Sequence, residues 1–124
     1  MAFSQVIKVG TSSLINAECK TFNLTALAAL AETVSDLREA GHGVVVVASG
    51  AVGAGCQRVG LSKRPAGLAR RRALAAVGQM HLMRYFSDFF SSAGLVSCLL
   101  QSYSHLLVHI DRSLSLSTFM IVNS

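Results

Sequence analysis

The sequence predicts an α/β fold with a mostly parallel sheet, and two observations lead to this prediction. Short runs rich in Val and Ile, typical of buried strands, occur at Gln5–Val9 and Val44–Ala48. Between them, apolar residues recur every three or four positions, as on one face of a helix. A strand, a helix and a second strand in this order form a βαβ unit, so we expect parallel strands joined by a right-handed crossover.

The composition fits one small domain. Of 124 residues, 52% are hydrophobic and 14% are charged, which excludes a disordered chain. No apolar run approaches the roughly 18–20 residues of a membrane span, and no secretory signal is recognisable, so no membrane partner is expected. Cys19, Cys56 and Cys98 are odd in number and scattered, so we expect reduced thiols in a cytoplasmic protein.

The helix between the two strands is predicted to begin at Leu24 and to end before Gly41. Asn23 precedes it as a helix N-cap, and Gly41 follows at the position where helices favour a left-handed glycine. We expect one apolar stripe of this helix to pack against the sheet. The stripe consists of Leu24, Leu27, Leu30, Val34 and Leu37.

The second half of the chain predicts one long helix and a third strand. Pro65 interrupts the chain, and the stretch from Ala66 to about Ser92 is rich in Ala, Leu, Arg and Met. Gly78 within it indicates a bend or close packing. Leu95–Leu100 then predicts a strand, and Leu114–Val122 is a candidate for a further one. The buried helix face is predicted to contain Leu68, Ala75, Leu82, Phe86 and Phe89, widened by Leu74, Val77 and Met83.

Small residues follow both strands of the βαβ unit, where parallel sheets build ligand sites. Lys8 lies at the end of the first strand, just before Gly10–Ser12, whose N–H groups suit phosphate oxygens beside an ammonium group. Ser49 opens a glycine-rich turn after the second strand. Two interpretations stay open here: a phosphoryl-transfer site, or turns that are small because the elements pack tightly. A nucleophilic role of Ser49 is disfavoured, because the glycine expected two residues before it is absent.

The formal net charge of +5 raises the question of an anionic partner. The densest basic cluster is Arg70–Arg72, with Lys63 and Arg64 just upstream. It lacks interleaved aromatic residues and any nucleic-acid motif, so no nucleic-acid partner is expected. The cluster is interpreted as a solvent-facing helix surface, with contact to an anion as the alternative. His105 and His109 lack an apparent third ligand, so no metal site is expected.

Three motifs resemble the amino-acid kinase superfamily and, within it, the glutamate 5-kinases. They are VIKVGTSSL at Val6–Leu14, GHGVVVVASGAVGAG at Gly41–Gly55 and KRPAGLARRRALAAVGQMHLM at Lys63–Met83. The resemblance implies the N-terminal part of the amino-acid kinase fold, a three-layer α/β/α sandwich with a mostly parallel sheet. This part is expected over residues 1–100, with a divergent tail at 101–124. The Lys63–Pro65 stretch is most similar to the eukaryotic, fungal-type enzymes.

The resemblance also implies an activity: ATP-dependent phosphorylation of the γ-carboxylate of L-glutamate, the first step of proline biosynthesis, with Mg²⁺ screening the charge. It implies a homo-oligomer as well. Lys8 is implied as the catalytic residue. The ATP phosphates are implied to bind Lys8, Gly10, Thr11 and Ser12, and the glutamate is implied to bind Ser49, Gly50 and Ala51.

The chain departs from the family in ways that keep other interpretations open. Arg72 stands where the family has a glutamine, and the family's later substrate segments, second catalytic lysine and nucleotide-binding half are not recognisable. One alternative is a catalytically inactive truncated product that associates with a full-length kinase, and another is a small basic nucleotide-binding domain. We expect the 124-residue chain alone to lack glutamate kinase activity. We also expect it to aggregate or to depend on a partner, because half a sheet exposes an edge.

Overall fold

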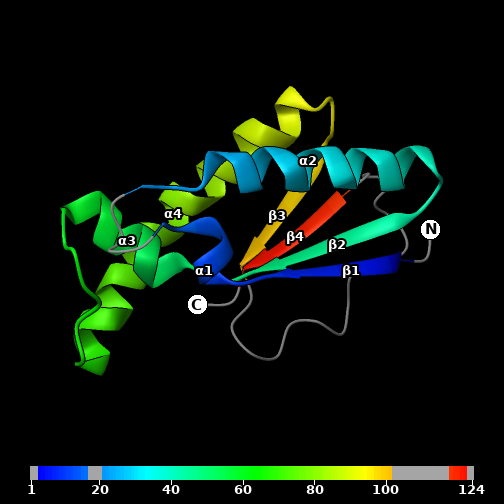
Figure 1. Ribbon diagram of the computed structural model, residues 1–124. Coiled ribbons are helices and arrows are strands. Elements are labelled where there is room, and N and C mark those ends of the chain that lie inside the picture. Colours follow the sequence, from blue (N-terminus) through cyan, green and yellow to red (C-terminus); the bar gives the residue numbers. More distant parts are fainter. Residues whose placement is uncertain (1–2, 17–20, 102–117, 123–124) are drawn as a thin grey trace.

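The computed structural model describes residues 3–16, 21–101 and 118–122. These residues form a four-stranded sheet with helices packed against it (Figure 1). The strands are β1 (Phe3–Val9), β2 (Gly43–Ala48), β3 (Ser97–Gln101) and β4 (Thr118–Val122). The helices are α1 (Thr11–Leu14), α2 (Leu24–Glu39), α3 (Ala51–Val59) and α4 (Leu68–Ser92).

The strands of the sheet are all parallel and lie in the order β1-β2-β4-β3. The predicted βαβ unit is confirmed, since β1 and β2 are parallel neighbours with α2 between them in the sequence. The sequence indicates a strand within 114–122, and β4 forms over 118–122, while 114–117 lie outside the described residues. β4 lies between β2 and β3. The division of the chain at residue 100 stays a prediction.

α2 begins and ends where the sequence predicts. The Asn23 side chain accepts a hydrogen bond from the Ala26 N–H at 3.1 Å. Gly41 has a φ of 89°, the left-handed conformation that ends a helix. Val34 in the predicted stripe is fully buried, but Leu24 is 52% exposed at the first helical position. The Asn23 cap and the conformation of Gly41 therefore define the two ends of α2 through local interactions.

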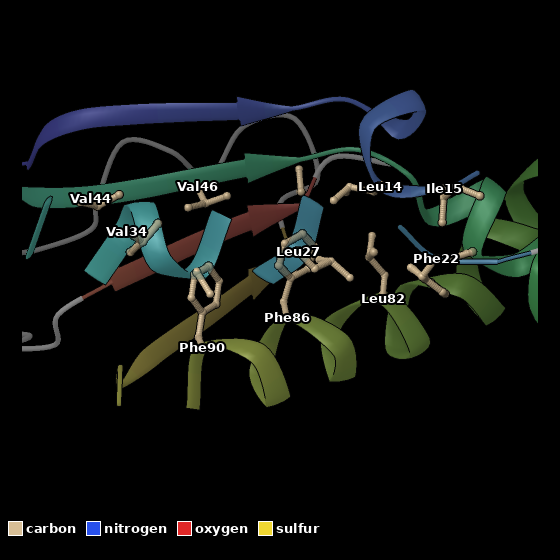
Figure 2. Packing of buried hydrophobic residues seen from close by; sticks show 13 residues of the cluster. Leu14, Ile15, Phe22, Leu27, Val34, Val44, Val46, Leu82, Phe86 and Phe90 are labelled. Atoms are coloured by element: carbon tan, nitrogen blue, oxygen red, sulfur yellow. The ribbon is translucent and has the colours of Figure 1, made fainter. Parts of the chain in front are cut away.

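The hydrophobic core lies between α2, α4 and one face of the sheet (Figure 2). Val44 and Val46 of β2 point into it, and Phe86 and Phe90 of α4 approach from the opposite side. Each is at most 1% exposed, and burying such a side chain contributes about 1.5–3 kcal/mol. α2 and α4 both contribute to this core, so in the described residues they cover the same face of the sheet.

α4 buries Leu74, Leu82 and Phe86 as predicted, but two residues of the predicted face are exposed. Leu68 and Val77 are 56% and 45% exposed, respectively. The first half of α4 packs on α3 rather than on the sheet, with Leu74 and Gly78 at the contact. The buried side of the helix consists of Leu74, Gly78, Gln79, Leu82, Phe86 and Phe90.

Candidate functional site

β1 and β2 end side by side, and the residues that follow them form the candidate site. The Ser49 N–H donates a hydrogen bond to the Val9 carbonyl at 3.0 Å, which ties the two strand ends together. Figure 1 shows the carboxyl ends of the strands converging beside α1 and α3. Open parallel sheets bind ligands at this edge. The structure thus brings together the two stretches that the sequence predicts to form a site.

Lys8 lies one residue before the end of β1, where Val47 of β2 is its register partner. Side chains alternate between the two faces of a strand. Ile7 and Val9 pack against the core, so Lys8 belongs to the opposite face of the sheet. Lys8 is exposed, and no acidic partner for it is found in the part of the chain that the structure describes. Its charge is available to an anionic ligand.

Gly10 and Ser12 lie at the start of α1. Gly10 is the N-cap of this short helix with an ordinary φ of −83°, and its carbonyl accepts a hydrogen bond from the Ser13 N–H at 3.1 Å. A Cβ built on Gly10 would meet no atom within 4 Å. Packing within the described residues therefore does not require glycine here, and a ligand has room to approach the backbone.

The glycine-rich stretch after β2 forms a helix, whereas the sequence predicts a turn. Gly50 has a φ of 138°, a conformation that residues with a side chain rarely adopt, and it turns the strand into α3. The Ala54 N–H donates to the Gly50 carbonyl at 2.8 Å. Gly53 and Gly55 lie inside the helix, so their role is close packing rather than turning.

Thr11 connects the two halves of the site. A Cβ on Gly50 would lie 3.8 Å from both Cα and Oγ1 of Thr11, and one on Gly53 would lie 3.2 Å from Thr11 Cγ2. The start of α1 therefore rests directly on the glycine surface of α3. This contact accounts for a small residue at Gly53, as the packing interpretation expects, whereas the φ of 138° accounts for Gly50. Ligand binding by Thr11, Ser49 or Ala51 stays a prediction.

Arg64 also lies at this site, although the sequence analysis groups it with the basic cluster around Arg70–Arg72. Its Nη2 is 3.3 Å from the Cβ position of Gly53, against the same point as the Thr11 methyl group. The loop between α3 and α4 thus brings a cation back to the first turn of α3. The chain has no local pattern that predicts this return.

Two glycines let α3 and α4 approach closely beneath the site. A Cβ on Gly55 would overlap the backbone of Leu74, and a Cβ on Gly78 would overlap the Ala51 carbonyl and the Gly55 nitrogen. The close packing that the sequence indicates at Gly78 is therefore confirmed. α4 directly supports the start of α3.

Gln79 is a buried polar residue in the same turn of α4. It is 5% exposed, and neither Nε2 nor Oε1 of its amide has a hydrogen-bond partner. Its neighbour Gly78 touches the Ala51 backbone, and the Leu82 side chain lies 3.9 Å from the Cβ position of Gly50. A buried amide without partners costs about 1–3 kcal/mol.

We expect Gln79→Met to raise the free energy of unfolding by about 1–3 kcal/mol, because methionine fills a similar volume without the unpaired amide. Urea unfolding of the wild type and the variant measures the difference. Met80→Gln is the control, because Met80 is 81% exposed, and its effect should stay within about 0.5 kcal/mol. A loss of stability in Gln79→Met would contradict the prediction.

Aromatic side chains surround His81 on α4. The His81 Nε2–H donates to Gln57 Oε1 at 3.0 Å. The Phe22 ring meets His81 edge-on, with ring centroids 5.4 Å apart, and stacks on Tyr85 at 4.2 Å. This cluster joins α3 and α4 to the start of α2.

Acidification is expected to destabilise the protein through His81. Burial and then the nearby charges of Arg58 and Arg84 lower the pKa of His81 from its ordinary value of 6.5. The unfolded chain therefore binds more protons than the folded one below about pH 6.5, so stability falls as the pH drops through that value. Melting temperatures at about pH 7.5 and 5.5 measure the loss. His81→Gln should reduce it, and an identical loss in the variant would contradict the role of His81.

Neither a cluster of metal-ligating side chains nor a membrane-spanning helix is found in the described residues. Within them, no group of three or more His, Cys, Asp or Glu side chains is placed to hold a metal ion. The candidate site offers hydroxyl, N–H and cationic groups, which do not fit Mg²⁺, because this ion prefers carboxylate oxygens. His105 and His109 lie outside the described residues. None of the described helices has the length and apolar character needed to cross a membrane.

Comparison with known proteins identifies the family. A model of the amino acid kinase family matches residues 4–118. The chain belongs to this family. It is 53% identical over 89 residues to the glutamate 5-kinase of Microcystis aeruginosa, covering 72% of this chain and 24% of that protein. The glutamate 5-kinase of Acaryochloris marina is 49% identical over 92 residues, covering 74% of this chain and 25% of that protein. The chain spans about a quarter of the length of these relatives.

A solved aspartate kinase from Synechocystis shares the fold. Its TM-score is 0.60 at 13% sequence identity, covering 97% of this chain and 21% of that one. The expected N-terminal part of the amino-acid kinase fold is therefore confirmed. The glutamate 5-kinases above are bacterial, as is a third from Nostoc punctiforme, 51% identical over 87 residues (70% of this chain, 24% of that protein). They do not support the expected similarity to eukaryotic, fungal-type enzymes.

Proposed function

We propose that this chain forms the substrate-binding edge of a glutamate 5-kinase, which phosphorylates the γ-carboxylate of L-glutamate with ATP at the entry to proline biosynthesis. One observation carries the proposal: the hydrogen-bonded ends of β1 and β2, which bring Lys8 and Ser49 to one edge of the sheet. The high identity to proteins named glutamate 5-kinase supports the choice of substrate.

The proposed reaction depends on positioning and charge neutralisation. A γ-carboxylate oxygen of glutamate attacks the γ-phosphorus of ATP, and the bond from that phosphorus to the ADP oxygen breaks. The Lys8 ammonium stabilises the charge on the transferring phosphoryl group. Mg²⁺ enters the proposal only as a companion of ATP. We assign the ATP phosphates to Lys8, Gly10, Thr11 and Ser12, and the glutamate to Ser49, Gly50 and Ala51.

The distribution of charge supports two anionic substrates. Cations lie at the site edge, whereas the acidic residues of the described part lie in the second half of α2 and near the end of α4. Both of these helix ends point away from the carboxyl ends of the strands, because each helix is followed by the start of the next strand. The acidic residues are Glu32, Asp36, Glu39 and Asp88.

Ligand binding to the purified chain tests the proposal. We expect L-glutamate and ATP each to raise the melting temperature and to titrate by calorimetry. Gly10→Ala should keep the melting temperature of the ligand-free protein, because its Cβ meets no described atom within 4 Å, while weakening ATP binding. If the wild type does not bind glutamate, or does not bind ATP, the proposal is wrong. Glutamate-dependent release of phosphate from ATP measures turnover separately.

We also propose that the protein acts as a homo-oligomer in the cytoplasm. Large apolar side chains are exposed at the end of α3, just after it and on α4, and exposed apolar surface marks interaction sites. They are Val59, Leu61, Leu68, Val77 and Met80, between 44% and 81% exposed. The buried thiol of Cys56 is consistent with a reducing compartment.

A further inference from the structure

Arg64 reaches the candidate site from a loop that the proposed reaction does not use. Its Nη2 and the Thr11 methyl group contact one point, the Cβ position of Gly53, at 3.3 and 3.2 Å. Gly53 is buried and Arg64 is exposed, so the side chain spans the surface and only its tip reaches the first turn of α3. Because residue 53 is glycine, no side chain of its own occupies this point. The guanidinium tip of Arg64 can therefore lie against it.

The charge of this tip has no counterpart in the described residues. A guanidinium group stays protonated throughout the physiological range, and the acidic residues named above lie toward the other end of the sheet. The first turn of a helix carries a positive partial charge and disfavours a cation beside it. α3 has no side-chain cap at Gly50. An anion bound between the Arg64 guanidinium group and the first turn of α3 would be attracted by both.

We propose that Arg64 binds the α-carboxylate of the glutamate substrate, an inference that rests on the proposed function. The γ-carboxylate reacts and must face the phosphate side at Lys8, whereas the α-carboxylate keeps its charge throughout the reaction. The planar guanidinium group matches a carboxylate through two parallel hydrogen bonds. Arg64 meets α3 at Gly53, two residues after Ala51, the last of the residues assigned to glutamate, at a point that the Thr11 methyl group also contacts. It is therefore a specificity-determining residue on the glutamate side.

Calorimetric titration of the purified chain tests this role with two probes, L-glutamate and its α-amide, isoglutamine. A hydrogen-bonded charge pair corresponds to a change of about 10-fold to 100-fold in Kd. We expect wild type to favour glutamate over isoglutamine by this factor, and Arg64→Ala to abolish the preference. Arg64→Lys should recover part of it. Gly53→Ala should weaken glutamate binding less, by displacing the guanidinium group without removing its charge.

Arg71→Ala is the matched control, because it removes the same charge from an exposed position in the first turn of α4. Arg71→Ala should change the Kd for glutamate less than about two-fold. Arg64→Ala should likewise change the Kd for ATP less than about two-fold. If wild type binds glutamate and Arg64→Ala retains the preference, or loses ATP affinity instead, the role of Arg64 is wrong while the proposed function stands. If wild type binds no glutamate, both proposals are wrong.

Discussion

Gly78→Ala will strongly destabilise the protein, although alanine is the better helix former. The added Cβ would overlap the Ala51 carbonyl and the Gly55 nitrogen, both of which are backbone atoms of α3. Separating the two helices exposes buried surface, and we expect a net loss of about 3 kcal/mol or more. This is a large part of the 5–15 kcal/mol that typically stabilises a domain. Urea unfolding followed by circular dichroism measures the loss.

Ala76→Gly provides the opposite control on the same helix. Ala76 is exposed, so its replacement should cost only the difference in helix propensity, about 1 kcal/mol. Gly55→Ala should repeat the large effect from the other side of the contact, because its Cβ would overlap the Leu74 backbone. A Gly78→Ala variant as stable as the wild type would show that the two helices do not pack this closely in solution.

Lys8→Ala will remove most of the phosphate-side function and leave the fold intact. Lys8 is exposed on β1, so its truncation leaves the core unchanged. Loss of a group that stabilises transition-state charge lowers kcat by about 10²–10³-fold. Because the sequence predicts that this chain alone lacks turnover, ATP affinity measured by calorimetry is the first readout, and glutamate-dependent phosphate release is the second.

Arg70→Ala is the charge-matched control for Lys8→Ala, since Arg70 is exposed near the start of α4. It should bind ATP as the wild type does. Equal ATP binding by the wild type and Lys8→Ala would contradict the assignment of Lys8 to the phosphates. Turnover by this chain that is lost in Lys8→Ala would instead contradict the expectation that it is inactive alone, while supporting the role of Lys8.

Local chemistry explains which parts of the fold were predictable from the sequence. Asn23 and Gly41 define α2 by interactions within a few residues, and both predictions are confirmed. The meeting of Lys8 and Ser49 at one edge follows from the general geometry of a parallel βαβ unit. Strand order depends on contacts between distant segments, so the place of β4 between β2 and β3 has no local signal.

The errors on α4 and at Arg64 have a similar cause. The apolar period of α4 predicts that Leu68 and Val77 are buried, but both are exposed, because α3 packs on the side of the helix that contains Leu74 and Gly78. Arg64 reaches Gly53 because the loop after α3 folds back. Both features depend on how α3 and α4 pack together. A glycine in the sequence indicates close packing but not which group lies against it.

The central position of β4 imposes an order on synthesis and folding. β1, α2 and β2 are consecutive and can assemble as soon as they leave the ribosome, whereas β3 pairs in the described sheet only with β4, which is made later. Long-range strand pairing of this kind slows folding. Until residues 118–122 emerge, the free side of β2 is a template for pairing with other nascent chains. The interval between the synthesis of β3 and that of β4 is therefore the period in which unpaired strand edges are most exposed.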